Sequence, residues 1–144
     1  MSKDENIFEI DINRLHEEWT QQPLLYAEYA EKLAHAKNKY EESKRDMDVV
    51  EAEMDANIRK DSASFGIEKI TEGAVDKAVI RSRRFTKAQA EMLRAKHKMD
   101  ILQAMVSALD QKKKALESLV QLRLANYFSE PTVPKDKREE LGRA

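Results

Sequence analysis

The chain has no cysteine, and it has only three glycines and three prolines among its 144 residues. Without cysteine it cannot form disulfides, thiolate metal sites or a cysteine nucleophile, which fits a reducing compartment. Charged residues make up 37% of the chain, above the usual quarter. Together with so few glycines and prolines, this composition is typical of long helices in water and argues against a β-sandwich or an α/β enzyme.

Aromatic residues are also scarce, at 6%, and the mean hydropathy is -0.74. A monomer of this composition buries too little apolar surface to offset its conformational entropy, so we expect self-association. No apolar run approaches about 18 residues, and no basic segment leads into an apolar one. We therefore expect neither a membrane span nor a secretory signal. The predicted location is the cytoplasm, or the host cytoplasm if the chain comes from a phage.

The formal net charge is -1, but the charges are distributed unevenly along the chain. Residues 1–58 carry a net charge of -8, residues 59–98 carry +6 and residues 99–144 carry +1. The balanced total therefore hides an acidic N-terminal part and a basic middle part. Such a basic segment is a candidate surface for an anionic partner.

The spacing of apolar residues and helix-breaking residues divides the chain into segments. We predict a flexible arm at 1–11, one helical hairpin domain at 12–130 and a flexible polar tail at 131–144. Helices are expected at about 12–21, 24–61, 71–81 and 87–128. Gln22-Pro23 is expected to end the first helix, and Thr86 with Gln89 resembles a capping box that opens the last one.

Both long segments carry apolar residues at heptad spacing, which predicts a coiled-coil-like seam. In the first segment the two seam positions hold Tyr26, Leu33, Tyr40, Met47 and Met54, and Tyr29, Ala36, Ser43 and Val50. In the second they hold Met92, Met99, Val106 and Val120, and Ala95, Leu102, Leu109 and Leu116, with Lys113 as the polar interruption. The predicted fold is all-α: a long antiparallel helical hairpin with short N-terminal and connector helices, assembling into a homo-oligomer.

The residues that catalysis or metal binding requires do not converge in the sequence. His16, His35 and His97 fall on different predicted helices, and none has a second His or a Cys at ligand spacing. No Gly-rich phosphate loop, Ser-centred elbow or HExxH motif is present. We therefore predict that the protein is not an enzyme and uses neither a metal nor another cofactor.

The basic middle part carries the candidate site. From Arg81 to Lys98 there are seven Lys or Arg residues, one acid, Glu91, and one aromatic ring, Phe85. Cations neutralise phosphates, and an aromatic ring stacks on an unpaired base, so the cluster predicts nucleic-acid binding. The predicted contact residues are Arg59, Lys60, Lys69, Lys77, Arg81, Arg83, Arg84, Phe85 and Lys87. The alternative is that these cations pair with acidic helix faces and bind no nucleic acid.

The order of elements resembles the UvsY-like recombination mediators of tailed bacteriophages. The resemblance lies in Trp19, the string Leu24-Leu25-Tyr26-Ala27-Glu28-Tyr29-Ala30-Glu31-Lys32-Leu33-Ala34, and the later strings at 99–103 and 108–116. It implies a ring-like homo-oligomer that binds single-stranded DNA and loads a RecA-type recombinase onto DNA covered by single-strand-binding protein. It implies no catalytic site.

The resemblance also points to a basic stretch near the end of the first long helix as the DNA contact. Here that stretch reads Asp55-Ala56-Asn57-Ile58-Arg59-Lys60, so Arg59 and Lys60 are displaced equivalents, or the contact has moved to Arg81, Arg83, Arg84 and Lys87. Two other functions remain open from the sequence. One is a structural coiled-coil oligomer, such as a phage scaffolding or chaperone-like factor, and the other is a transcription or replication adaptor whose target is protein.

Overall fold

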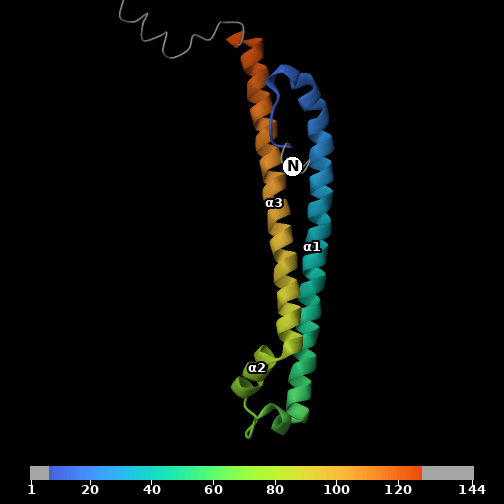
Figure 1. Cartoon of the computed structure of the whole chain (residues 1–144), viewed down its shortest axis with the longest axis vertical. Coiled ribbons are helices and arrows are strands. Elements are labelled where there is room, and N and C mark those ends of the chain that lie inside the picture. The colour runs from blue at the N-terminus through green and yellow to red at the C-terminus, as the bar shows by residue number, and fades with distance from the viewer. Residues whose placement is uncertain (1–6, 128–144) are drawn as a thin grey trace, which may run out of the picture. The chain divides into compact units, whose positions relative to one another are not determined.

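Three α-helices make up most of the computed structural model, which describes residues 7–127 (Figure 1). They are α1 (Leu15–Lys60), α2 (Glu72–Arg81) and α3 (Arg83–Leu124). Two 3-10 turns, η2 (Ile12–Arg14) and η3 (Ser62–Phe65), precede and follow α1. Residues 7–127 contain no strand, which confirms the all-α prediction. The predicted tail at 131–144 lies outside the described residues.

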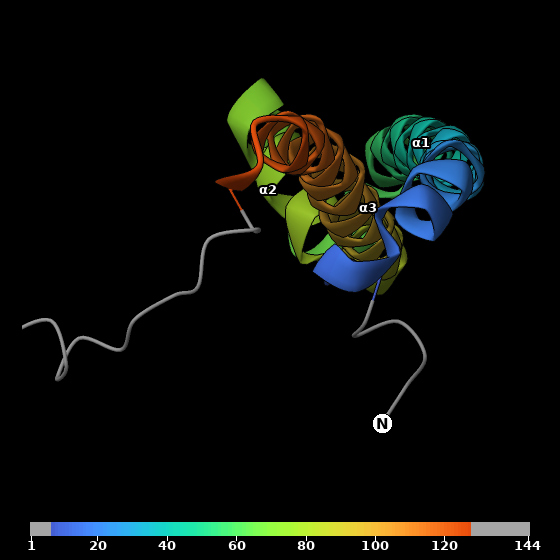
Figure 2. The same ribbon diagram turned by 90° about the horizontal axis from the view of Figure 1, so that it is seen from above.

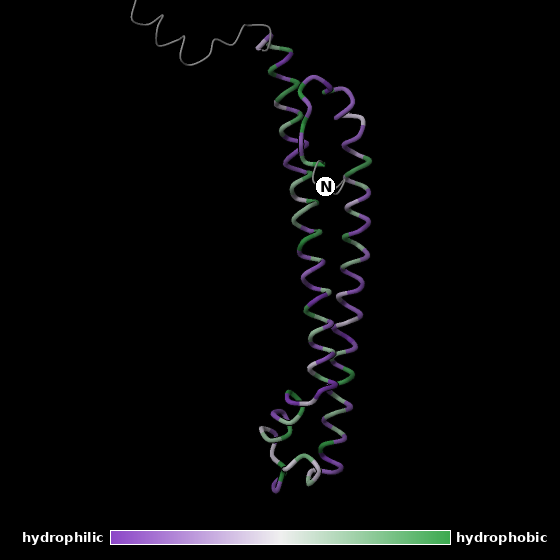
Figure 3. Tube along the Cα trace, viewed as in Figure 1, coloured by the Kyte–Doolittle hydropathy of each residue, from purple (hydrophilic) through white to green (hydrophobic). Residues whose placement is uncertain are grey.

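The chain divides into two compact units, and α1 and α3 each contribute to both. Unit 1 consists of Met1–Leu25 with Ala108–Ala144, and unit 2 consists of Tyr26–Ser107. Figure 3 shows apolar and polar residues alternating along both long helices. Within residues 7–127, no helix is long and apolar enough to cross a membrane.

Unit 2 is organised around the seam that the heptads predict. Tyr29, Leu33, Ala36 and Ser43 of α1 are buried, as are Leu102 and Val106 of α3. Tyr26, the first residue of the unit, is 44% exposed and does not continue the buried stripe. Residues 32–39 and 95–102 line one groove, whereas Glu53 pairs with Arg84, so the two helix segments of this unit run in opposite directions. Figures 1 and 2 both show these segments side by side.

A compact apolar cluster joins all three helices within unit 2. Ile58 and Val75 are fully buried, and Met54, Val79 and Phe85 complete the cluster. Along α1 and α2 the cluster residues are spaced three or four residues apart, so each helix turns one face to the core. This packing fixes α2 against the end of α1 and the start of α3.

Local capping explains where α2 and the turn before it begin and end. The Thr71 hydroxyl accepts a hydrogen bond from the backbone N–H of Ala74 at 3.1 Å, the usual bond of an N-cap residue. Gly66 ends η3 with φ +72°, a left-handed conformation that a residue with a side chain rarely adopts. Its N–H donates to the Ala63 carbonyl at 3.1 Å.

The predicted break at Gln22-Pro23 is wrong, because α1 continues through Pro23. Proline removes one helical hydrogen bond and crowds the preceding turn, so isolated helices rarely tolerate it. Here tertiary contacts hold the preceding turns. Leu15 is buried, and the Gln22 amide nitrogen donates to the Leu109 carbonyl of α3 at 2.7 Å.

The predicted boundaries of the last helix are also wrong. Helix α3 begins at Arg83, and Ser82 provides the cap, because its hydroxyl accepts from the N–H of Phe85 at 3.3 Å. The Thr86 hydroxyl instead donates to the Ser82 carbonyl at 2.9 Å, inside the first turn. At the other end, the helix stops at Leu124, and Asn126 adopts φ 58°. A left-handed Asn after the last turn is a common helix stop.

Lys112, rather than Lys113, lies in the seam of unit 1. Its side chain is only 5% exposed, and its ammonium contacts a Glu18 carboxylate oxygen at 2.9 Å and the Ile7 carbonyl at 2.8 Å. Lys113 lies outside, 3.9 Å from Glu117. The prediction of Lys113 as the interruption is wrong because the buried positions in this part of α3 are Leu109, Lys112 and Leu116, three and four residues apart, and Lys113 falls beside that face. The contact with Ile7 also attaches residues of the predicted free arm to this unit.

We predict that Lys112→Ala lowers the free energy of unfolding by roughly 1–3 kcal/mol, because it leaves Glu18 and the Ile7 carbonyl without their buried donor. Lys113→Ala is the matched control, since it removes an exposed pair of a kind that contributes little. Urea unfolding followed by circular dichroism measures both. Equal midpoints for the two variants would contradict this assignment of the seam.

Candidate nucleic-acid interface

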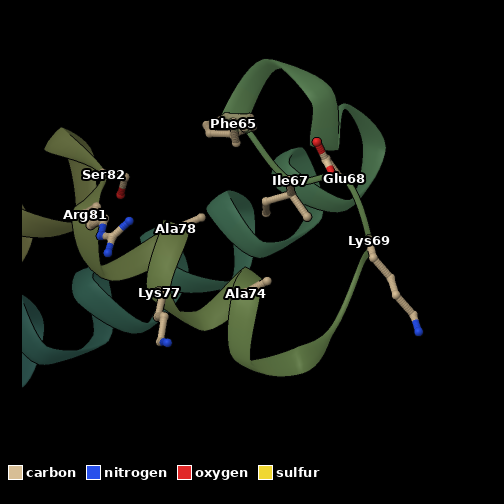
Figure 4. A pocket seen from close by; sticks show the side chains of 10 residues that line it. Phe65, Ile67, Glu68, Lys69, Ala74, Lys77, Ala78, Arg81 and Ser82 are labelled. Carbon is tan, nitrogen blue, oxygen red and sulfur yellow. The ribbon is translucent and has the colours of Figure 1, made fainter.

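A groove of about 560 Å³ lies between the turn after α1 and helix α2, within unit 2 (Figure 4). One wall is Phe65, Gly66 and Ile67, and the other is the face of α2 that carries Ala74, Lys77, Ala78 and Arg81. The small alanine side chains keep this part of the groove open. The buried Val75 and Val79 lie on the core side of the same helix, so α2 separates the groove from the core.

Positive charge predominates around this groove. Lys69, Lys77 and Arg81 line it with one acid, Glu68, and all four residues are exposed. None of the ion pairs found among residues 7–127 involves any of the three cations. Lys77 and Arg81 lie one helical turn apart on the same face of α2, whereas Lys69 extends outward from the rim (Figure 4). The structure therefore brings these three predicted site residues together.

Arg59 is held in place by two carboxylates. Its Nε donates to Asp55 at 2.8 Å, and its Nη2 donates to Glu72 at 2.7 Å. These hydrogen bonds raise the pKa of Arg59 above its ordinary value. Since Glu72 belongs to the first turn of α2, Arg59 links the end of α1 to the start of α2. Its donors are thus engaged in positioning α2, and this argues against the predicted role of Arg59 in phosphate contact.

Two further predicted site residues have structural contacts. Arg84 forms an ion pair with Glu53 of α1, between side chains that are about half exposed. Phe85 is only 8% exposed and packs in the apolar cluster of unit 2. This burial argues against the prediction that Phe85 stacks on a base, because little of the side chain is accessible.

The remaining predicted residues are exposed but do not line the groove. Lys60 ends α1, Arg83 begins α3, and Lys87 lies one turn later beside Asp46 and Glu91. Among residues 7–127, none of these three cations takes part in an ion pair within 4.0 Å. They can add to the positive field without forming part of the groove.

The sequence prediction missed residues in two places. Phe65, 41% exposed, is the aromatic side chain that the groove presents. It stands alone between small and polar residues, so no periodic pattern marks it. A second groove of about 450 Å³ in the same unit is lined by Lys32, His35, Lys39 and Lys98 over Ala36, Ala95 and Leu102. Its cations come from two helices and become neighbours only when these pack.

Within residues 7–127, no group of three or more His, Cys, Asp or Glu side chains is arranged to hold a metal ion.

Comparisons with known proteins give no family: no family model, no curated protein and no solved structure matches this chain.

Proposed function

We propose that this protein binds single-stranded DNA through the basic side chains of unit 2 and acts as a recombination mediator without a catalytic site. The observation that carries the binding proposal is the groove lined by Lys69, Lys77 and Arg81, which have no ion pair among the described residues. Exposed cations without local partners are available to neutralise phosphates. The resemblance to UvsY-like mediators supports loading of a RecA-type recombinase on DNA covered by single-strand-binding protein.

The proposal includes one antiparallel hairpin formed by α1 and α3, and a homo-oligomer of such hairpins. Contacts inside each unit support the hairpin, since Glu18 pairs with Lys112 in unit 1 and Glu53 with Arg84 in unit 2. Leu93 and Ile101 support self-association, because these large apolar side chains of α3 are exposed. Light scattering tests it: a mass several times 16.7 kDa supports the oligomer, and 16.7 kDa contradicts it.

The experiment that tests DNA binding is a fluorescence-anisotropy titration with a labelled single-stranded oligonucleotide at low ionic strength. We expect saturable binding that weakens as salt is added, because each phosphate contact releases counterions. Absence of binding at low salt would contradict the proposal. A pull-down of a RecA-type recombinase under DNA-free conditions tests the protein partner separately.

A second candidate function is a structural coiled-coil oligomer that binds no nucleic acid. The observation that favours it is the pairing of two predicted contact residues, Arg59 with Asp55 and Glu72, and Arg84 with Glu53. These two basic residues thus connect one helix of unit 2 to another. The DNA titration separates the two functions, since a purely structural oligomer gives no change in anisotropy.

A further inference from the structure

Phe65 occupies an unusual position for a large apolar side chain. It is the last residue of η3, it remains 41% exposed, and Gly66 turns the chain immediately after it. Figure 4 shows its ring on the wall of the groove opposite Ala78 and Arg81. Ile67, two residues later, packs against the apolar cluster, which anchors the turn. The ring is thus presented to the groove by an anchored segment.

We propose that this groove accepts one unpaired base of a single-stranded DNA, stacked on the Phe65 ring, with neighbouring phosphates on Lys77 and Arg81. The inference rests on the proposed function and adds to it a base site and a preference for single strands. An aromatic ring stacks on any base, since every base has a π face. In a duplex both faces of each base are already stacked, so no base face is free to stack on the Phe65 ring.

The shape and charge of the groove fit a nucleotide. Its volume of about 560 Å³ lies in the range of sites that hold small molecules. Opposite the ring, the short side chains of Ala74 and Ala78 form an apolar surface that does not project into the groove. A flat group fits on such a surface better than a bulky one. Lys77 and Arg81 supply two cations, and the one acid of the groove, Glu68, lies on the side of Ile67, away from both (Figure 4).

The test compares variants at Phe65 in the full-length chain by anisotropy, with a labelled oligonucleotide of about 20 nucleotides, longer than one binding site, and with its duplex. Phe65→Ala is expected to weaken single-strand binding roughly 5- to 150-fold and to leave duplex binding and the salt dependence unchanged. Phe65→Tyr keeps the ring and is expected to bind like the wild type. Ile80→Ala is the matched control, because Ile80 is an exposed apolar residue of α2 outside the groove.

The outcomes distinguish this inference from the proposed function. If the wild-type chain does not bind the single strand, the proposed function fails and the base site fails with it. If the wild type binds and Phe65→Ala binds equally well, the base site alone is overturned. Phe65→Leu retains apolar volume without a ring, so it carries the same test if circular dichroism shows that the alanine variant is unfolded. Equal losses on single strand and duplex would also overturn the stacking assignment.

Discussion

Replacing Lys69, Lys77 and Arg81 together by alanine is expected to weaken single-stranded DNA binding by about 10²-fold at about 0.1 M salt. Each cation that contacts a phosphate of a single strand contributes a salt slope of about -0.7, which corresponds to roughly fivefold in affinity at this salt concentration. Three such contacts multiply to about two orders of magnitude. The slope of log affinity against log salt is expected to become shallower by about 2 in the triple variant.

Arg84→Ala is the matched control for this loss. It also removes one cation of unit 2, but the Arg84 guanidinium is paired with Glu53 and does not line the groove. We expect less than about a twofold change in affinity, since the Arg84 guanidinium is engaged by Glu53 and makes no phosphate contact in the groove. Alanine favours helix at positions 77 and 81, so circular dichroism is expected to show folded variants. Equal losses for the triple variant and Arg84→Ala would contradict the placement of the site.

Phe85→Ala is expected to lower the free energy of unfolding by about 3–5 kcal/mol. Phe85 is buried with Met54, Ile58, Val75 and Val79, so removal of the ring leaves a cavity at the junction of all three helices. Such a loss is a large fraction of the total stability of a small domain. Urea unfolding monitored by circular dichroism measures it directly.

Ile80→Ala provides the control for the core assignment. Ile80 is 61% exposed, so its truncation is expected to change the free energy of unfolding by less than about 0.5 kcal/mol. If Phe85→Ala were as stable as Ile80→Ala, the ring would not be a core residue, and its predicted stacking role would regain support.

The helical part of the fold could be predicted because heptad spacing reports which face of a helix is covered. Leu33, Ala36, Leu102 and Leu109 are all buried as their positions in the repeat indicate. The same rule could have identified Phe85, which precedes Met92 by one heptad and therefore belongs to the seam. Its neighbours in sequence are cationic, and that local context led to the stacking prediction.

Features that depend on contacts between distant residues could not be predicted in this way. Pro23 is a helix breaker by local rules, but the bond from Gln22 to the Leu109 carbonyl joins residues far apart in the chain. Lys112 and Lys113 are adjacent and of the same residue type, so residue type does not show which of them is buried. Lys112 lies inside because it shares a buried face of α3 with Leu109 and Leu116 and pairs there with Glu18, a residue far away in the chain.

The sequence predicted which segment of the chain carries the candidate site, but it did not predict which residues of that segment line the groove. Charge counting located the basic segment, and Lys69, Lys77 and Arg81 indeed lie together there. Net charge per segment cannot distinguish a free cation from one that a carboxylate holds across a turn, as Asp55 and Glu72 hold Arg59. Phe65 was not predicted as a site residue because it lies in a turn, where no periodicity separates exposed from buried side chains.

The central claim is that the groove of unit 2 binds single-stranded DNA through phosphate contacts. The measurement that tests it most directly is the affinity of the wild-type chain for a single-stranded oligonucleotide at several salt concentrations. Contacts from Lys69, Lys77 and Arg81 predict a slope of log affinity against log salt of about -2 or steeper. No binding at low salt, or an affinity that does not change with salt, would contradict the claim.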